Sequence, residues 1–94
     1  MEIRAGTPSS VAVGTTAVLV VGRNPTRVML ALVNTGAVNL TIGLGSAPVD
    51  GSGVVLSASG GSFLIDGNNP FFDGVYAISS GAGTTLAYQE TGRG

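Results

Sequence analysis

Glycine is the feature of this sequence that most limits its fold. Sixteen glycines occur among the 94 residues, and they recur every several residues beside Ser, Thr, Asn and Pro. Glycine is unfavourable inside a helix and its neighbours here favour turns, so no window of helical length remains between them. The runs between the glycines are short and rich in Val, Ile, Leu, Thr and Tyr, which suit a half-buried strand. The sequence therefore predicts an all-β protein.

The spacing of these runs predicts about eight short strands joined by turns, as in an antiparallel β-sandwich with jelly-roll-like or Greek-key-like connections. The order of the strands stays open. We expect a hairpin through Thr35 and Gly36, with Leu40, Ile42 and Leu44 on one face of its second strand. The expected strands are residues 11–13, 17–21, 27–34, 39–44, 54–57, 63–66, 75–79 and 84–90.

The core is expected to form around two of these strands. Residues 17–21 have almost no polar alternation, which is typical of a strand that is buried on both faces or lies in a subunit contact. Together with part of residues 27–33 they form the predicted centre. The side chains expected to pack across from them are Leu40, Ile42, Phe63, Ile65, Tyr76, Ile78 and Leu86.

A chain of this length fits one domain, and its composition does not change along it. We expect a flexible arm over residues 1–10, a single sandwich over residues 11–91 and a polar tail over residues 92–94. The start of the chain lacks the apolar run of a secretory signal, so we expect synthesis in a cytoplasm. The longest apolar stretch, residues 11–21, is far shorter than the ~20 residues that span a bilayer, so no membrane partner is expected.

The composition points to association with other proteins. Hydrophobic residues make up 44% of the chain and charged residues only 10%, against about 25% charged in typical soluble domains. Uncharged surface of this extent favours a homo-oligomer. The net charge of −1 argues against nucleic acid, which needs clustered cations. All the basic residues are arginines, which suit partly desolvated contacts; they are Arg4, Arg23, Arg27 and Arg93.

Catalysis and cofactors are not expected, because the chain has no His, Cys or Lys. Their absence removes the commonest general bases, thiol nucleophiles, Schiff-base amines and zinc ligands. A carboxylate mechanism would have to draw on Glu2, Asp50, Asp66, Asp73 and Glu90. Asp66, Asn68, Asn69 and Asp73 offer oxygen ligands for calcium, but their spacing matches no known calcium loop. We interpret them as turn residues that bond their own backbone.

The candidate interface combines arginines with one aromatic loop. Phe71 and Phe72 are consecutive, so in an extended segment only one of them need enter the core and the other is free to anchor a partner. The alternative is that both rings cap the end of the sandwich. Arg23 and Arg27 flank a turn, where they are either solvated or paired with carboxylates of a neighbour. The candidate interface residues are Arg4, Arg23, Arg27, Asn68, Asn69, Phe71 and Phe72.

Several segments between residues 21 and 91 carry a resemblance: the run from Arg23-Asn24-Pro25 through residues 30–36, then residues 42–45, 59–62 and 74–78. In them the chain resembles small virion proteins of tailed bacteriophages, namely the β-sandwich decoration (cement) proteins of the head and related fibre-base modules. The resemblance implies a capsid-binding accessory protein, often trimeric, that sits where major capsid subunits meet. It carries no catalytic motif.

Two functions follow as expectations. The first is a non-enzymatic virion structural protein, made in the host cytoplasm, that binds the major capsid protein on the outside of an assembled phage capsid and stabilises it. The second is a carbohydrate- or receptor-binding module of a phage fibre or spike. The second would use aromatic faces beside amides and a carboxylate; the residues available are Phe71, Phe72, Tyr76 and Tyr88, with Asn68, Asn69 and Asp73.

Overall fold

The computed structural model describes residues 3–4, 8–81 and 83–93, with residues 3, 4 and 93 described by their backbone alone. Within these residues the chain forms nine strands and no helix, which confirms the all-β prediction. The eight expected strands correspond to β2 through β9, and β1 is additional. No helix in the described part has the length and apolarity that a membrane crossing requires. The strands are β1 (Ile3–Arg4), β2 (Ser9–Val13), β3 (Val18–Val21), β4 (Arg27–Asn34), β5 (Leu40–Leu44), β6 (Val54–Leu56), β7 (Ser62–Ile65), β8 (Val75–Ser79) and β9 (Thr84–Arg93).

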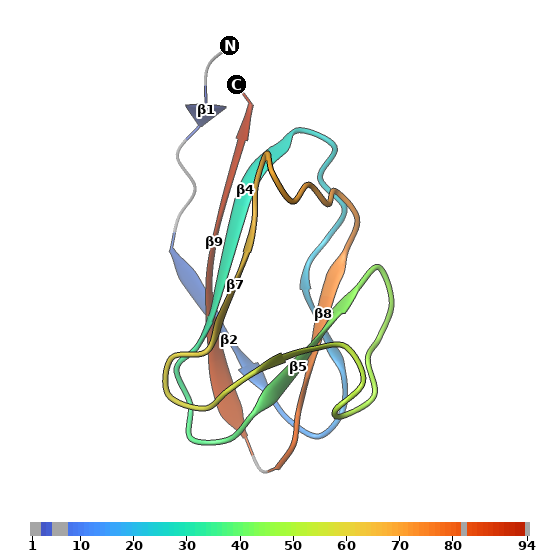
Figure 1. Ribbon diagram of the computed structural model, residues 1–94, viewed down its shortest axis with the longest axis vertical. Coiled ribbons are helices and arrows are strands. Elements are labelled where there is room, and N and C mark those ends of the chain that lie inside the picture. Colours follow the sequence, from blue (N-terminus) through green and yellow to red (C-terminus); the bar gives the residue numbers. More distant parts are fainter. Residues whose placement is uncertain (1–2, 5–7, 82, 94) are drawn as a thin grey trace.

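The strands form two antiparallel sheets that face each other (Figure 1). The five-stranded sheet has the order β1-β9-β4-β7, with β2 also pairing with β9, and the four-stranded sheet has the order β3-β8-β5-β6. The pairs β2 with β9, β3 with β8, β4 with β7 and β5 with β6 are nested, as in one long hairpin. Folding that hairpin over on itself produces a jelly roll. The structure thus confirms the antiparallel sandwich and selects one of its two expected topologies.

The predicted hairpin at Thr35 and Gly36 is wrong, because β4 and β5 belong to different sheets. The segment between them crosses from one sheet to the other, and the buried amide of Asn34 holds it. The Asn34 Nδ2 donates to the carbonyl oxygens of Val38 at 2.7 Å and Leu56 at 3.1 Å, and its Oδ1 accepts from the backbone N–H of Gly36 at 3.0 Å. A buried amide with all its groups paired stabilises the crossing. The turn residues predicted a turn correctly, but not which strands it joins.

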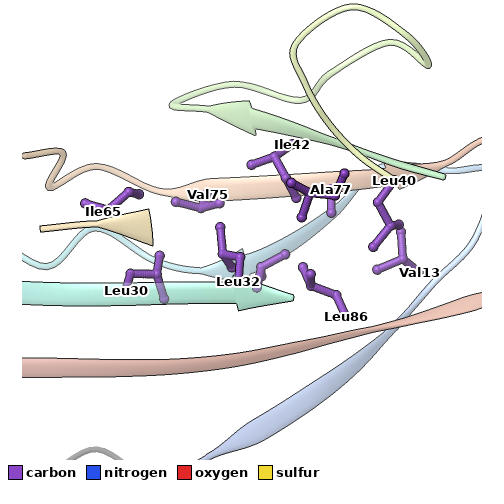
Figure 2. Close-up of a cluster of buried hydrophobic side chains, with 11 residues drawn as sticks. Val13, Leu30, Leu32, Leu40, Ile42, Ile65, Val75, Ala77 and Leu86 are labelled. Atoms are coloured by element: carbon purple, nitrogen blue, oxygen red, sulfur yellow. The ribbon is translucent and has the colours of Figure 1, made fainter. Parts of the chain in front are cut away.

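The core lies between the two sheets (Figure 2). Within the predicted core strand 27–33, Leu30 and Leu32 are fully buried, as are four of the residues expected across from it, Leu40, Ile42, Ile65 and Leu86. Phe63 is partly buried against them. The remaining buried hydrophobic residues are Val13, Val20, Leu56, Val75 and Ala77.

Two core predictions are wrong. In β8 the buried side chains are Val75 and Ala77, whereas Tyr76 and Ile78 are only partly buried. Because consecutive residues there are all apolar, a period of two could not choose the inward face. In β3, Val20 is buried and Val18 and Val21 pack against the core, as predicted, but Leu19 is 52% exposed. Of the two interpretations of residues 17–21, burial on both faces within one chain is therefore wrong. The strand lies at the edge of the four-stranded sheet.

Parts of both predicted terminal segments belong to strands. Within the predicted flexible arm 1–10, Ile3 and Arg4 pair with the end of β9, and Ser9 and Ser10 begin β2. Within the predicted tail 92–94, Gly92 and Arg93 belong to β9. Residues 1–2, 5–7 and 94 lie outside the described residues. The long strand β9 supplies the backbone partners of β1 and β2, which local composition does not reveal.

Gly61, in the crossing from β6 to β7, should not tolerate a side chain. A Cβ placed there would lie 2.3 Å from the backbone nitrogen of Ser57 and 2.6 Å from its carbonyl oxygen. Backbone atoms cannot rotate away, so we expect Gly61→Ala to lower the free energy of unfolding by about 1–3 kcal/mol in urea titrations. Gly67→Ala is the matched control, because its Cβ would meet nothing within 4 Å. Equal stability of the two variants would contradict this packing.

Candidate functional site

Charged side chains gather at one end of the sandwich. The turn from β3 to β4, the segment from β7 to β8, β1 and the end of β9 lie there (Figure 1). Among the described side chains, Asp50 in the loop from β5 to β6 is the one charge away from this end. The others are Arg23, Arg27, Asp66, Asp73 and Glu90.

Arg27, the first residue of β4, is buried at 3% exposure. Its Nε forms an ion pair with the carboxylate of Glu90 in β9. One terminal nitrogen donates to the carbonyl oxygens of Phe71 at 2.8 Å and Asp73 at 3.1 Å, and the other donates to that of Gly22 at 3.0 Å. The guanidinium therefore ties together the two loops and the last strand at this end.

This arrangement corrects the expectation that Arg27 belongs to an interface. A residue whose guanidinium is buried and bonded inside its own chain has a structural role at the end of the sandwich. From the sequence alone, its partner, Glu90, is a candidate only as a carboxylate for catalysis. The two residues lie 63 positions apart, so no local signal links them.

Phe71 and Phe72 differ in burial, as one of the two interpretations of the sequence predicts. Phe71 is partly buried and packs against the core, whereas Phe72 is 43% exposed. Both line a groove of about 320 Å³ at the charged end. The other lining residues are Arg27, Val28, Ile65, Asp66, Gly67 and Pro70. The groove is mainly apolar, with Phe72 as an exposed ring at its side.

Asp66, Asn68 and Asn69 form a turn. One carboxylate oxygen of Asp66 accepts from the backbone N–H of Asn68 at 2.9 Å and of Asn69 at 3.2 Å. The Asn69 side chain donates to the carbonyl oxygen of Leu64 at 3.2 Å. These bonds match the interpretation of the segment as turn residues that bond their own backbone. No group of acidic residues in the described part of the chain is arranged to hold a metal ion.

The remaining candidates lie at the same end. Arg23 is exposed in the turn after β3, and the next residue, Asn24, donates its backbone N–H to the carbonyl oxygen of Phe72 at 2.7 Å. The backbone of Arg4 pairs with Gly92, which in turn pairs with Arg27. The structure thus brings the sequence-predicted residues to one end, with Arg23, Asn68, Asn69 and Phe72 exposed there.

A second surface, which the sequence did not single out, is the outer face of the four-stranded sheet. None of its four strands contains a charged residue. Leu19 in β3 is 52% exposed, Val55 in β6 is 48% exposed, and Val49 in the loop from β5 to β6 is 70% exposed. Tyr76 and Ile78 are partly buried in β8. Exposed apolar side chains grouped without charges are typical of a contact surface.

The outer face of the five-stranded sheet differs. Its outward side chains include Ala12, Ala31 and Ala87 with Ser and Thr residues, and Leu64 is its one large side chain exposed to a similar degree, at 47%. The two faces therefore offer different contact chemistry. Among the described residues, the most exposed large apolar side chains, Val49, Leu19 and Val55, lie on the four-stranded sheet or its loop.

No family model matches the sequence, and no curated protein matches it. Among solved structures, the chain is similar to a protein from a study titled "Bacillus endospore appendages form a novel family of disulfide-linked pili". The two are 20% identical, with a TM-score of 0.59, over 97% of this chain and 88% of that chain. At this identity the similarity shows a common fold.

Proposed function

We propose that this protein is a non-enzymatic structural protein that joins a larger protein assembly. The observation that carries the proposal is the uncharged outer face of the four-stranded sheet, which leaves Leu19, Val49 and Val55 about half exposed or more. Contact with another protein surface would remove this apolar area from water, at about 25 cal/mol for each Å². At the charged end, the ion pair between Arg27 and Glu90 stabilises the fold.

In its specific form, the proposal is that the protein binds the major capsid protein on the outside of an assembled phage capsid and stabilises the shell. The resemblance of the sequence to decoration proteins supports this form. The small jelly roll fits it, because such a domain offers two broad faces and needs no active site. The virion location and the trimer that the resemblance implies remain predictions.

A second candidate is a subunit of a fibre. The observation that favours it is the fold shared with a protein of pili that are described as disulfide-linked. The present chain contains no cysteine, so copies of these 94 residues would have to associate through non-covalent contacts. In that case the purified protein would form filaments on its own.

For the carbohydrate- or receptor-binding alternative, the structure brings together fewer of the aromatic and amide residues than were expected from the sequence. Tyr88 packs against the core and Tyr76 lies on the outer face of the four-stranded sheet, away from the aromatic groove. Phe72, Asn68 and Asn69 remain exposed at the charged end. Binding to host-cell glycans is therefore one of the results that the test below distinguishes.

The test mixes the purified protein with undecorated, expanded phage heads at low salt and at roughly molar salt, where charge interactions are screened within about 3 Å. We expect the protein to co-sediment with the heads at both salt concentrations, because a contact through apolar groups does not depend on ion pairs. Contacts to phosphate, by contrast, weaken steeply with salt.

Three results would count against the capsid form. Filaments in the absence of heads would favour the fibre subunit. A protein that ignores the heads and binds host-cell glycans would favour the receptor-binding module. Binding to heads at low salt that disappears at molar salt would contradict an apolar contact.

A further inference from the structure

The outer face of the four-stranded sheet is stepped, because the loop from β5 to β6 folds back over β5. The hydroxyl of Thr41, which points outward from β5, accepts from the backbone N–H of Gly51 at 2.9 Å, and Thr41 is 1% exposed. At Gly43, the next outward position, a Cβ would lie 2.2 Å from the carbonyl oxygen of Ser46. Residues 45–53 therefore lie directly on this part of the sheet.

The loop presents an apolar ridge. Pro48 is buried against β5, and a Cβ at Gly43 would lie 2.8 Å from its ring. Val49 follows at the tip and is 70% exposed. A bridge between Val49 and Ser52 closes the tip. We call Pro48 and Val49 the ridge.

Beside the ridge, the half of the face formed by β3 and β8 is uncovered. Leu19 and Tyr76 are paired across these strands, and Ile78 is the next outward residue of β8. Leu19 is 52% exposed, and the other two are partly exposed. We call these three residues the bare half.

We propose that the ridge of one copy packs on the bare half of a second copy of this chain, in a reciprocal two-fold contact. A two-fold axis parallel to the strands places each ridge on the bare half of the other copy, so both steps are filled at once. The proposal rests on the structural role proposed above and names a second copy as the partner of this face, so binding of the dimer to a larger assembly would use its other surfaces.

The absence of charge and the stepped shape of this face favour a second copy as the occupant. A charged group pressed against this face would be buried without an opposite charge, because the strands of the four-stranded sheet contain none. The occupant must therefore present an uncharged apolar surface, and the same face of another copy is one. The nearby charges are Asp50, next to the ridge, and Arg23, two residues after β3; both are exposed. The ridge therefore lies beside a negative charge and the bare half beside a positive one, and these opposite signs favour the proposed orientation.

The test uses two charge variants and a control. Leu19→Lys and Val49→Glu each change a side chain at least half exposed, so both should fold, as melting followed by circular dichroism will check. Leu64→Lys places the same charge at a 47% exposed position on the other sheet. Native mass spectrometry then measures the masses across a concentration series.

We expect dimers of the unchanged protein and of Leu64→Lys, and monomers of the two charge variants, with dissociation constants raised about 100-fold or more. An equimolar mixture of Leu19→Lys and Val49→Glu should form a heterodimer, because one of its two contacts then joins lysine to glutamate and the other is unchanged.

An unchanged protein that stays monomeric, or a dimer that persists in both charge variants, would overturn the proposal. A mass of three copies would also overturn it, in favour of the trimer implied by the resemblance. Failure of the capsid proposal is a separate result: a dimer that does not bind heads supports this contact and rejects that function.

Discussion

An Ile42→Asp variant is expected not to fold. Ile42 is 0% exposed in β5, and every member of the buried cluster around it is hydrophobic. A carboxylate at this position would have no cation and no hydrogen-bond donor from those side chains. The cost of an unpaired buried charge, several kcal/mol or more, is comparable with the total stability of roughly 5–15 kcal/mol for a domain. Far-UV circular dichroism and urea titration measure the loss.

Leu64→Asp is the control for this variant. Leu64 is also a strand residue, but it is 47% exposed on the outer face of the five-stranded sheet. Its carboxylate stays in water, so the control should fold and unfold cooperatively with a change within about 0.5 kcal/mol. A soluble Ile42→Asp variant with a cooperative transition would mean that the inward face of β5 is wrongly assigned.

Arg27→Met is expected to lower the free energy of unfolding by about 3 kcal/mol, at the low end for loss of one member of a buried ion pair, because the Glu90 side chain is 25% exposed. Methionine keeps much of the apolar stem but donates no hydrogen bond. The carbonyl oxygens of Gly22, Phe71 and Asp73 lose their donor, and Glu90 loses its cation. Urea titration measures the loss of free energy of unfolding. Faster amide exchange in the loops from β3 to β4 and from β7 to β8 would show where the structure is destabilised.

Two comparisons define this result. Arg23→Met removes an exposed arginine from the same end and should change stability by no more than about 0.5 kcal/mol. The double variant Arg27→Met with Glu90→Met should recover part of the loss, because no carboxylate is then left unpaired. If Arg27→Met proves as stable as Arg23→Met, the guanidinium does not hold this end together.

The positions of the strands could be predicted from the sequence because their signals are local. Short runs of β-favouring residues between glycines place β4, β5 and β8 within a residue or so of their observed bounds. The pairing of the strands is not local. In a jelly roll nearly every connection crosses between sheets, so the turn after Asn34 joins β4 to a strand with which it does not pair. Amino-acid propensity does not distinguish a crossing turn from a hairpin turn.

The candidate site could be predicted in part for the same reason. Phe71 and Phe72 were expected to divide between core and surface as one possibility, because neighbours in an extended chain point in opposite directions. The burial of Arg27 depends on Glu90 and on carbonyl groups 44 and 46 residues away, which only the folded chain brings together. The exposed apolar face exists because Tyr76 and Ile78, and not Val75 and Ala77, point outward from β8, and because the loop from β5 to β6 folds back over β5. Residues 75–78 are all apolar, so alternation could not identify the outward face of β8, and the position of the loop depends on its contacts with Thr41 and Gly43.

The measurement that tests the central claim most directly is sedimentation velocity of the unchanged protein over a concentration series, at low salt and at roughly molar salt. The claim is that the uncharged face of the four-stranded sheet is a contact surface between copies of this chain. It predicts a sedimentation coefficient that rises with concentration equally or more strongly at molar salt, because salt screens charges but does not weaken apolar burial. A monomer at every concentration, or association that disappears at molar salt, would contradict it.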